Sequence, residues 1–175
     1  MKKQLRLLLW EECNRACAGC WNKQFDLANL PVCTDFSKYE LIMLTGGEPM
    51  LYPDKVTNII QEIRTQTNAP IYIYTAKVND LHEIYNLMFM VQGWTVTLHD
   101  DSDVMPFRRF AGFMDPYWYH VKKKPSLRVN IFKNVDVSDV LWKEHFYEGW
   151  KIKSGIEWIN PCSLPHNEVL MRWKS

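Results

Sequence analysis

The sequence predicts an α/β fold, specifically an incomplete (β/α)6-type TIM barrel with parallel strands. Short apolar runs alternate along the chain with longer amphipathic runs, which is the pattern of repeated β/α units. One β/α unit takes about 30 residues, so the 175-residue chain holds about six units and falls short of the roughly 250 residues of a complete eight-fold barrel. No fixed-period repeat, low-complexity stretch or Gly/Ser linker interrupts it, so we expect one domain over residues 1–175.

Six short apolar segments are expected to be strands. They cover residues 4–10, 40–45, 70–75, 94–99, 126–132 and 151–159. Residues 54–66 predict a helix, because apolar residues recur at helical spacing behind Asp54, which can cap the first turn. Residues 79–90 repeat this pattern, and residues 137–146 give a weaker helical signal.

The charge, the apolar runs and the cysteines limit which molecules the chain is expected to bind and where in the cell it is expected to lie. The 21 basic and 20 acidic side chains leave a formal charge of +1, so no bulk attraction to nucleic acid or to an anionic membrane is expected. No run of 18 apolar residues occurs, and the first residues do not form the apolar region of a signal peptide, so we expect a cytoplasmic protein. Three of the five cysteines fall within eight residues, which favours a metal-type site over disulfides.

The clustered cysteines directly follow the first expected strand. Cys13, Cys17 and Cys20 have C-x3-C-x2-C spacing, which allows three thiolates to wrap one metal centre. A structural zinc site or an electron-carrier cluster uses four protein ligands, whereas three thiolates on a [4Fe-4S] cubane leave one iron open. The count of three therefore favours a centre that binds an exogenous ligand.

Two other interpretations fit the same spacing. Positions 13, 17 and 20 would share one face of a buried helix, although Asn14 and Arg15 are poor core neighbours and Gly19 weakens a helix. Alternatively, Cys33 or a histidine completes a zinc site, which would make the protein a non-catalytic zinc or iron–sulfur carrier module.

A second motif, Gly46-Gly47-Glu48-Pro49, stands at the end of the second expected strand. The two glycines let backbone approach a ligand closely, Glu48 offers an acceptor for an ammonium group, and Pro49 fixes the chain as it leaves. Alone, this tetrapeptide reads as an ordinary turn. Ligands gather at the carboxyl ends of parallel strands, so we expect this motif, the cysteine segment and polar residues after later strands to converge on one face.

Together, the two motifs resemble those of the radical S-adenosylmethionine (SAM) superfamily over roughly residues 4–75. The resemblance implies that Cys13, Cys17 and Cys20 hold three irons of a [4Fe-4S] cluster, and that its fourth iron binds the amino and carboxylate groups of SAM. It also implies that Glu48 and the backbone of the two glycines bind the SAM amino group.

Four further residues match the superfamily's SAM contacts by position and polarity. Thr75 stands at the end of the third strand, where a polar residue often contacts SAM. His99, Arg128 and Asn130 on the fourth and fifth strands match contacts to ribose or carboxylate, and a structural role suits each of them equally.

The resemblance implies an enzyme in which a low-potential donor, such as a flavodoxin or ferredoxin, reduces the cluster. SAM is then cleaved to methionine and a 5′-deoxyadenosyl radical, which abstracts hydrogen from a small-molecule or peptide substrate. The segment with Gly19, Trp21 and Asn22 also resembles the small activating proteins of anaerobic ribonucleotide reductase, which place a glycyl radical on a partner polypeptide. Those proteins carry a glycine-rich segment before the first strand that this sequence lacks.

The remaining candidates favour structural roles. Cys33 and Cys162 lie far from the triplet and from each other, so we expect buried free thiols. Asp100, Asp101 and Asp103 follow His99 and offer oxygen ligands for a cation, but a solvated loop or the cap of the next helix is the preferred interpretation.

Overall fold

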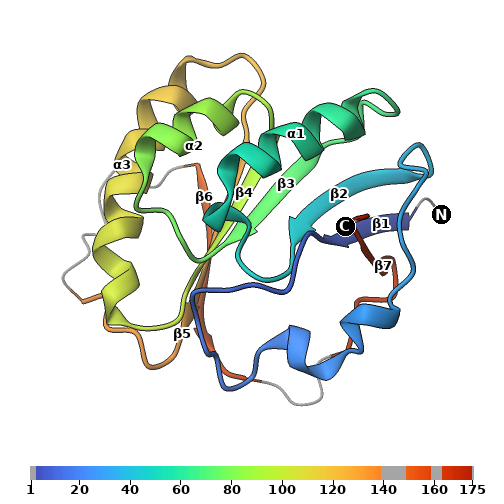
Figure 1. Cartoon of the computed structure of the whole chain (residues 1–175). Helices are drawn as coiled ribbons and strands as arrows, with labels where there is room; N and C mark the ends of the chain where they lie inside the picture. The colour runs from blue at the N-terminus through green and yellow to red at the C-terminus, as the bar shows by residue number, and fades with distance from the viewer. Residues whose placement is uncertain (1–2, 139–148, 159–162, 175) are drawn as a thin grey trace. The chain divides into compact units, whose positions relative to one another are not determined.

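A computed structural model of the chain describes residues 3–138, 149–158 and 163–174, without the side chains of Trp21 and Tyr119 (Figure 1). The chain divides into two compact units. The first combines Met1–Tyr74 with Trp158–Ser175, and the second is Thr75–Glu157. The described residues form an α/β structure with seven strands, and the pairings within each unit are parallel. None of the helices in these ranges is long and apolar enough to cross a membrane.

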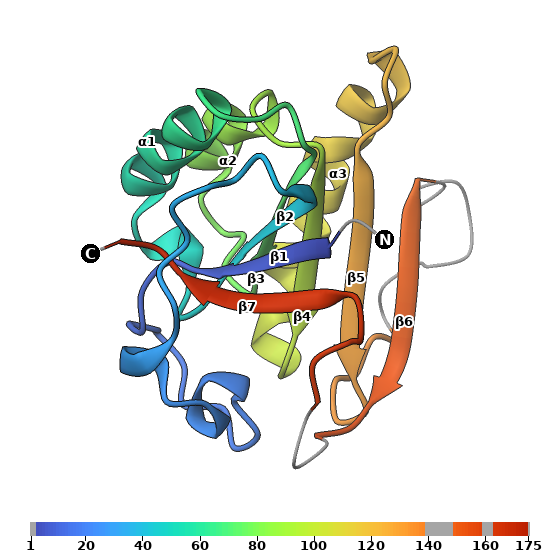
Figure 2. The same ribbon diagram turned by 90° about the vertical axis from the view of Figure 1, so that its right-hand side faces the viewer.

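The first unit is a parallel sheet with one long helix. Its strands are β1 (Lys3–Leu8), β2 (Tyr39–Thr45), β3 (Ile71–Thr75) and β7 (Glu168–Arg172), in the order β3-β2-β1-β7. Figure 2 shows β7 beside β1 and running in the same direction. Helix α1 (Pro53–Arg64) follows β2 and buries Val56, Ile59, Ile60 and Ile63. Three short 3-10 helices are η1 (Trp21–Gln24), η2 (Leu27–Asn29) and η3 (Pro49–Leu51).

The core of this unit follows from the apolar residues of its strands. Leu5, Leu7, Ile42, Leu44, Ile71 and Ile73 are fully removed from solvent. Leu8, at the end of β1, pairs with Thr45, at the end of β2. The two neighbouring strands therefore deliver the cysteine segment and the Gly46-Gly47-Glu48-Pro49 motif at the same edge of the sheet.

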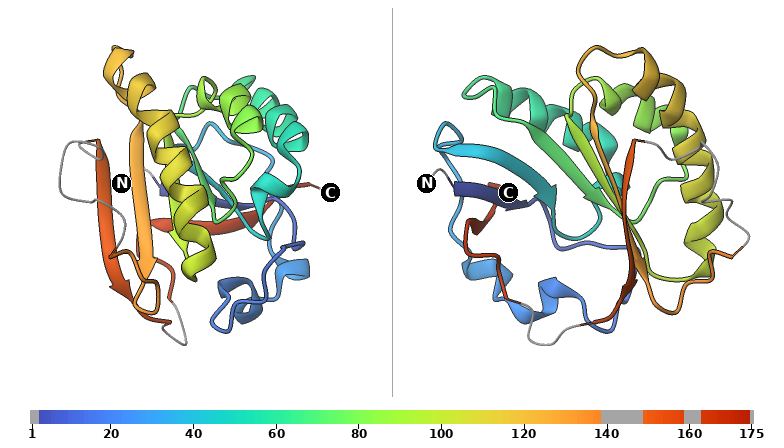
Figure 3. Two further views of the ribbon diagram at one scale, coloured as in Figure 1. Left: turned by 90° about the vertical axis from the view of Figure 1, so that its left-hand side faces the viewer. Right: turned by 180° about the vertical axis from the view of Figure 1, so that it is seen from behind.

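The second unit holds three parallel strands and two helices. They are α2 (Leu81–Met88), β4 (Gly93–Leu98), α3 (Val104–His120), β5 (Ser126–Phe132) and β6 (Trp150–Ile156), with the 3-10 turn η4 (Asp101–Asp103) before α3. Strand β5 lies between β4 and β6 (Figure 3). Aromatic rings pack α3 against this sheet. The ring centroids of Trp94 and Phe110 lie 5.6 Å apart and those of Phe107 and Trp150 lie 5.0 Å apart, both pairs edge to face.

The six expected strands are confirmed, each with ends shifted by no more than a few residues. Among the strands and α-helices of the described residues, two were not expected, namely β7 and α3. The apolar positions of α3 have helical spacing, but Pro106 and Pro116 break its sequence pattern. Asp54 lies in the first turn of α1, whose cap position is Tyr52, so its assignment as the cap was wrong. Most of the helix expected at residues 137–146 lies outside the described residues.

Candidate functional site

The cysteine segment leaves β1 as an irregular loop. Residues 11–20 contain no helix, so the interpretation of the cysteines as one face of a buried helix was wrong. The Cys20 N–H donates to the Cys17 carbonyl at 3.2 Å, and the Lys23 N–H donates to the Cys20 carbonyl at 3.0 Å as η1 begins. The Lys23 ammonium also donates to the Cys17 carbonyl at 3.1 Å. These bonds fix the backbone of the loop around its last two cysteines.

The three thiols of this loop are free and interact with one another. Cys13 is exposed, and Cys17 and Cys20 are half-buried. Desolvation raises the pKa of Cys17, and the neighbouring Cys20 and Cys13 raise this pKa further. Desolvation is also the largest cause of the raised pKa of Cys13, to which Glu48 and Cys20 add. The Cys13 thiol therefore lies within electrostatic reach of both the cysteine set and the second motif.

The second motif is a tight turn that only glycine can make here. Gly46 and Gly47 adopt φ of +84° and +52°, in the left-handed region. A Cβ on Gly47 would lie 2.0 Å from the carbonyl oxygen of Glu12, and one on Gly46 would lie 2.3 Å from the Leu8 side chain. The glycines thus allow the end of β2 to pack directly against the chain leaving β1.

Two hydrogen bonds join the motif to the cysteine loop. The Glu48 N–H donates to the Glu12 carbonyl at 2.9 Å, and the Trp10 indole donates to the Glu48 carbonyl at 3.1 Å. Tyr52, just beyond the motif, donates its hydroxyl to the Glu12 carboxylate at 2.5 Å and packs edge to face on Trp10 with ring centroids 5.4 Å apart. The two segments therefore form one braced structure.

Glu48 itself is 3% exposed and performs a structural task. Its Oε1 accepts the N–H of Met50 at 2.9 Å, which caps the short helix η3 that begins at Pro49. A buried carboxylate is costly unless it is hydrogen-bonded or paired with a cation. The position therefore suits an acceptor for a cationic group, while part of its bonding capacity already serves the fold.

Sequence reasoning did not identify four residues that build this structure: Trp10, Glu12, Tyr52 and Trp158. Trp158 packs so closely on the loop that a Cβ on Gly19 would lie 2.5 Å from its ring. Nothing local marks Trp158, because it lies nearly 140 residues from the loop. Trp10 lies three residues before Cys13 and Tyr52 three residues after Pro49, so aromatic residues close to both motifs were the available signal.

Thr75, the third-strand residue that we expected to contact SAM, lies at the start of the second unit. Thr75 is 5% exposed, and its hydroxyl accepts the Lys77 N–H at 2.9 Å and donates to the Lys77 carbonyl at 3.2 Å. This hydroxyl therefore closes a local turn.

His99, Arg128 and Asn130 are brought to one face of the second unit. Arg128 pairs in register with Thr95, and Asn130 with Thr97. His99 continues the alternation of β4 on the same face and stacks on Phe132 with ring centroids 5.1 Å apart. The Arg128 guanidinium donates to the Ser126 hydroxyl at 3.3 Å. All three are half-buried, so this face presents polar groups that solvent or a ligand can reach.

The acidic residues after His99 serve as a helix cap. Asp103 is buried and accepts the N–H groups of His99 and Asp100, while Asp100 accepts the N–H of Ser102 at 3.0 Å. Asp101 accepts the Asp136 N–H at 2.7 Å. The preferred interpretation as a helix cap is confirmed for Asp100 and Asp103, which form the capping box of η4, whereas the Asp101 side chain holds the backbone of Asp136 instead.

The other cysteines do not join the triplet in the described residues. Cys33 is 3% exposed, its thiol lies 3.9 Å from the Asp35 carbonyl, and burial raises its pKa. The expectation of a buried free thiol is confirmed for Cys33, while Cys162 lies outside the described residues. Within the described ranges, no three His, Cys, Asp or Glu side chains are already gathered closely enough to hold a metal ion.

No model of a known protein family matches the chain, and a search of curated protein sequences finds no significant match.

Proposed function

We propose that the protein is a radical SAM enzyme in which Cys13, Cys17 and Cys20 hold a [4Fe-4S] cluster. The observation that carries the proposal is the bracing of the three-cysteine loop against the Gly46-Gly47-Glu48 turn by the Glu48–Glu12 and Trp10–Glu48 hydrogen bonds. Two motifs about 25 residues apart in sequence thereby become one structure, in which the Cys13 thiol lies within electrostatic reach of the buried Glu48.

The residues present fit such a cluster by chemistry. Three thiolates are the ligands that a cubane with one open iron requires, and the three thiols are free and mutually interacting. Within the described residues these thiols are not gathered closely enough to hold a metal ion, so cluster binding would require their side chains to move together. Cys33 is buried with its thiol at its own loop, so it does not complete a four-ligand zinc or carrier site.

The chain's own residues would orient SAM and shield the site. The Gly46-Gly47 turn lets backbone approach the ligand, and Glu48 offers a buried acceptor for the amino group. Trp10, Tyr52 and Trp158 pack around the loop and would limit the access of water. A bound cluster, reduced by a low-potential donor, would supply the electron for the cleavage of SAM to methionine and a 5′-deoxyadenosyl radical. That radical would remove hydrogen from a small-molecule or peptide substrate.

We also propose that the fold is an incomplete (β/α)6-type barrel. The parallel pairings in both units support this proposal, and so does the position of both motifs at the same end of β1 and β2. His99, Arg128 and Asn130 are proposed to contact SAM, since they present polar groups on an accessible face of the second unit. Thr75 is proposed to contribute through its position at the end of β3, with its hydroxyl held by Lys77.

Reconstitution with iron and sulfide under anaerobic conditions tests the cluster assignment. We expect about four irons and four sulfides per chain, and a change in the EPR spectrum of the reduced protein when SAM is added. Cys13→Ala, Cys17→Ala and Cys20→Ala should each lose most of this iron, whereas Cys33→Ala should retain it. Equal iron binding by the Cys17→Ala and Cys33→Ala variants, or zinc as the only tightly bound metal, would reject the assignment.

A further inference from the structure

Strands β5 and β6 carry basic side chains on one face of the second unit. Arg128 on β5 pairs in register with Lys151 on β6, and Asn130 pairs with Lys153. Paired residues of parallel strands point to the same side of a sheet, and so do alternate residues of one strand. The three cations therefore share one face. It is the face opposite α3, because Trp150, the residue before Lys151, packs on that helix.

No acidic side chain of the sheet balances this charge. Strands β4, β5 and β6 contain neither aspartate nor glutamate. Lys151 and Lys153 are exposed, and neither forms an ion pair within the described residues. Like charges opposite each other on neighbouring strands repel, so the pairing of Arg128 with Lys151 carries an energetic cost. A bound anion would remove this cost.

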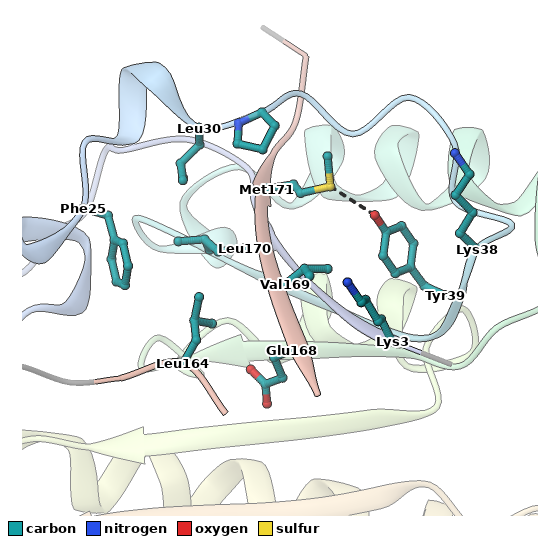
Figure 4. Close-up of a pocket in the computed structure, with 11 residues that line it drawn as sticks. Lys3, Phe25, Leu30, Lys38, Tyr39, Leu164, Glu168, Val169, Leu170 and Met171 are labelled. Carbon is teal, nitrogen blue, oxygen red and sulfur yellow. Dashed lines mark hydrogen bonds between the residues drawn. The ribbon is translucent and has the colours of Figure 1, made fainter. Parts of the chain in front are cut away.

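A cavity in the first unit provides a contrast. It has a volume of about 780 Å³ and lies beside β7, and its charged lining includes Lys38 and Glu168 (Figure 4). Lys38 pairs with Asp35 at 3.0 Å, and Glu168 accepts two hydrogen bonds from Arg6 at 2.9 and 2.7 Å. These charges are already balanced by the chain itself. The basic face of the second unit is therefore the stronger candidate for binding an anion.

A buried hydroxyl beside Arg128 points to the same conclusion. Thr95 on β4 pairs in register with Arg128, so its side chain lies on the basic face. It is 2% exposed, and its hydroxyl has no hydrogen-bond partner among the described residues. A buried hydroxyl without a partner lowers stability. A phosphate oxygen, or a water molecule held by one, would accept this hydrogen bond.

The spacing of the cations fits the phosphate groups of a small molecule. Neighbouring strands lie about 4.8 Å apart and alternate residues of one strand about 7 Å apart, so the three cations surround an area the size of one or two phosphates. Arginine and lysine are the usual cationic ligands of phosphate in proteins. SAM does not fill this role, because its sulfonium and ammonium groups outweigh its single carboxylate. The formal charge of +1 for the whole chain gives no extended field for nucleic acid.

We propose that the face formed by Thr95, Arg128, Lys151 and Lys153 binds the phosphate groups of a small phosphorylated molecule. The planar guanidinium of Arg128 holds one phosphate through two N–H donors, and the two lysines neutralise the remaining charge. Arg128 is also a proposed SAM contact, so the lysine pair carries the test. Binding requires no cluster, so this site stands whether or not SAM is cleaved.

Calorimetric titration of the full-length protein with inorganic pyrophosphate, without added iron, tests the proposal. Pyrophosphate should bind and shift the amides of Arg128, Lys151 and Lys153 in the ¹H–¹⁵N NMR spectrum. Combining Lys151→Gln with Lys153→Gln should weaken binding about tenfold, because two charge-assisted contacts are lost. The matched control combines Lys122→Gln with Lys123→Gln, which removes the same charge from an exposed loop of the same unit and should leave binding unchanged.

Tricarballylate, which carries three planar carboxylates, should bind about fivefold more weakly than pyrophosphate at the same ionic strength, because tetrahedral phosphates direct oxygens to all three cations. Equal binding of the two anions would overturn the proposal, as would absence of pyrophosphate binding. Equal weakening by the control substitutions would reduce the effect to overall charge and also overturn it. Tighter binding of a short single-stranded DNA, with shifts that extend to the amides of residues 122–124, would replace the small molecule with nucleic acid.

Discussion

Glu48 has a structural role as a helix cap and a separate proposed role in ligand binding. Its carboxylate caps η3 through the Met50 N–H, yet its burial near Cys13 suits an acceptor for an ammonium group. The two demands can be separated because glutamine keeps a side-chain carbonyl oxygen that can accept the Met50 N–H but loses the negative charge.

Glu48→Gln should therefore leave the thermal unfolding midpoint nearly unchanged, while SAM binding by the reconstituted protein weakens about tenfold or more. Glu48→Ala should weaken SAM binding and also lower the free energy of unfolding by about 1 kcal/mol, because the cap is lost. Anaerobic calorimetry and thermal unfolding measure both effects. If Glu48→Gln bound SAM as tightly as the parent, Glu48 would be a helix cap alone.

Asp115 on α3 provides a pH test of the second unit. Its half-buried carboxyl has a pKa raised to about 6, because desolvation disfavours the charged form. The folded chain therefore keeps this proton up to about pH 6, while the unfolded chain releases it near the ordinary aspartate pKa of 3.8. Stability from this group is fully present below pH 3.8 and is lost as the pH rises through 6.

Asp115→Asn should thus raise the free energy of unfolding at pH 7.5 by about 1 to 2 kcal/mol, after allowance for partial exposure, and have little effect at pH 4. Chemical denaturation at the two pH values measures the difference. Glu40→Gln, at an exposed position, serves as the control. A stabilisation of equal size at both pH values would show that ionisation of Asp115 is not its cause.

At the scale of elements, the turn after β2 requires glycine at position 47 both for its left-handed backbone and for the lack of room for a Cβ. Gly155 shares only the first requirement, so the two positions can be compared. Gly47 and Gly155 both have positive φ, of +52° and +68°, so an alanine at either position would raise the free energy of the folded backbone. Only Gly47 also faces a neighbouring atom, the Glu12 carbonyl, whereas a Cβ on Gly155 meets nothing within 4 Å.

Gly155→Ala should therefore lower the free energy of unfolding by about 1 kcal/mol, and Gly47→Ala by at least about 1 kcal/mol more. Gly47→Ala should also loosen the cysteine loop, which faster amide exchange of Glu48 would reveal, since its N–H bonds Glu12. Equal destabilisation by the two substitutions would contradict the close packing of the turn against residue 12.

The elements also show which features of the fold the sequence allows one to predict. Runs such as Ile71–Thr75 and Ser126–Phe132 were found because apolar residues mark them locally. Strand β7 has five residues with a charged residue at each end, and it becomes a strand by pairing with β1, more than 160 residues away. Helix α3 was missed because of its two prolines, although its buried Phe107 and Phe110 have the spacing of a helix face.

In the candidate site, too, some features could be predicted from the sequence and others could not. The cysteines and the Gly46–Pro49 motif could be identified because their residue types and spacing carry chemical meaning within a few positions. The contacts that join them could not be identified, because the Glu48–Glu12 bond and the packing of Trp158 on Gly19 arise only when distant segments fold together. The capping role of Glu48 was also hidden, since Met50 donates a backbone group that sequence patterns do not distinguish.

For the whole molecule, the central proposal is that three cysteines of this chain hold an iron–sulfur cluster that would supply the electron for the cleavage of SAM. Three observations support it: the thiols are free and interact with one another, the glycine turn packs against their loop, and Glu48 is buried. It does not depend on the substrate, because SAM cleavage without substrate is expected to proceed slowly once the cluster is reduced.

Formation of 5′-deoxyadenosine by the anaerobically reconstituted full-length protein, with dithionite as reductant and SAM supplied, tests this claim most directly. Chromatography with mass detection should show 5′-deoxyadenosine and methionine in equal amounts, and Cys17→Ala should form neither, while Cys33→Ala should form both. A fully iron-loaded, reduced protein that forms no 5′-deoxyadenosine, or a Cys17→Ala variant that forms as much as the parent, would contradict the account.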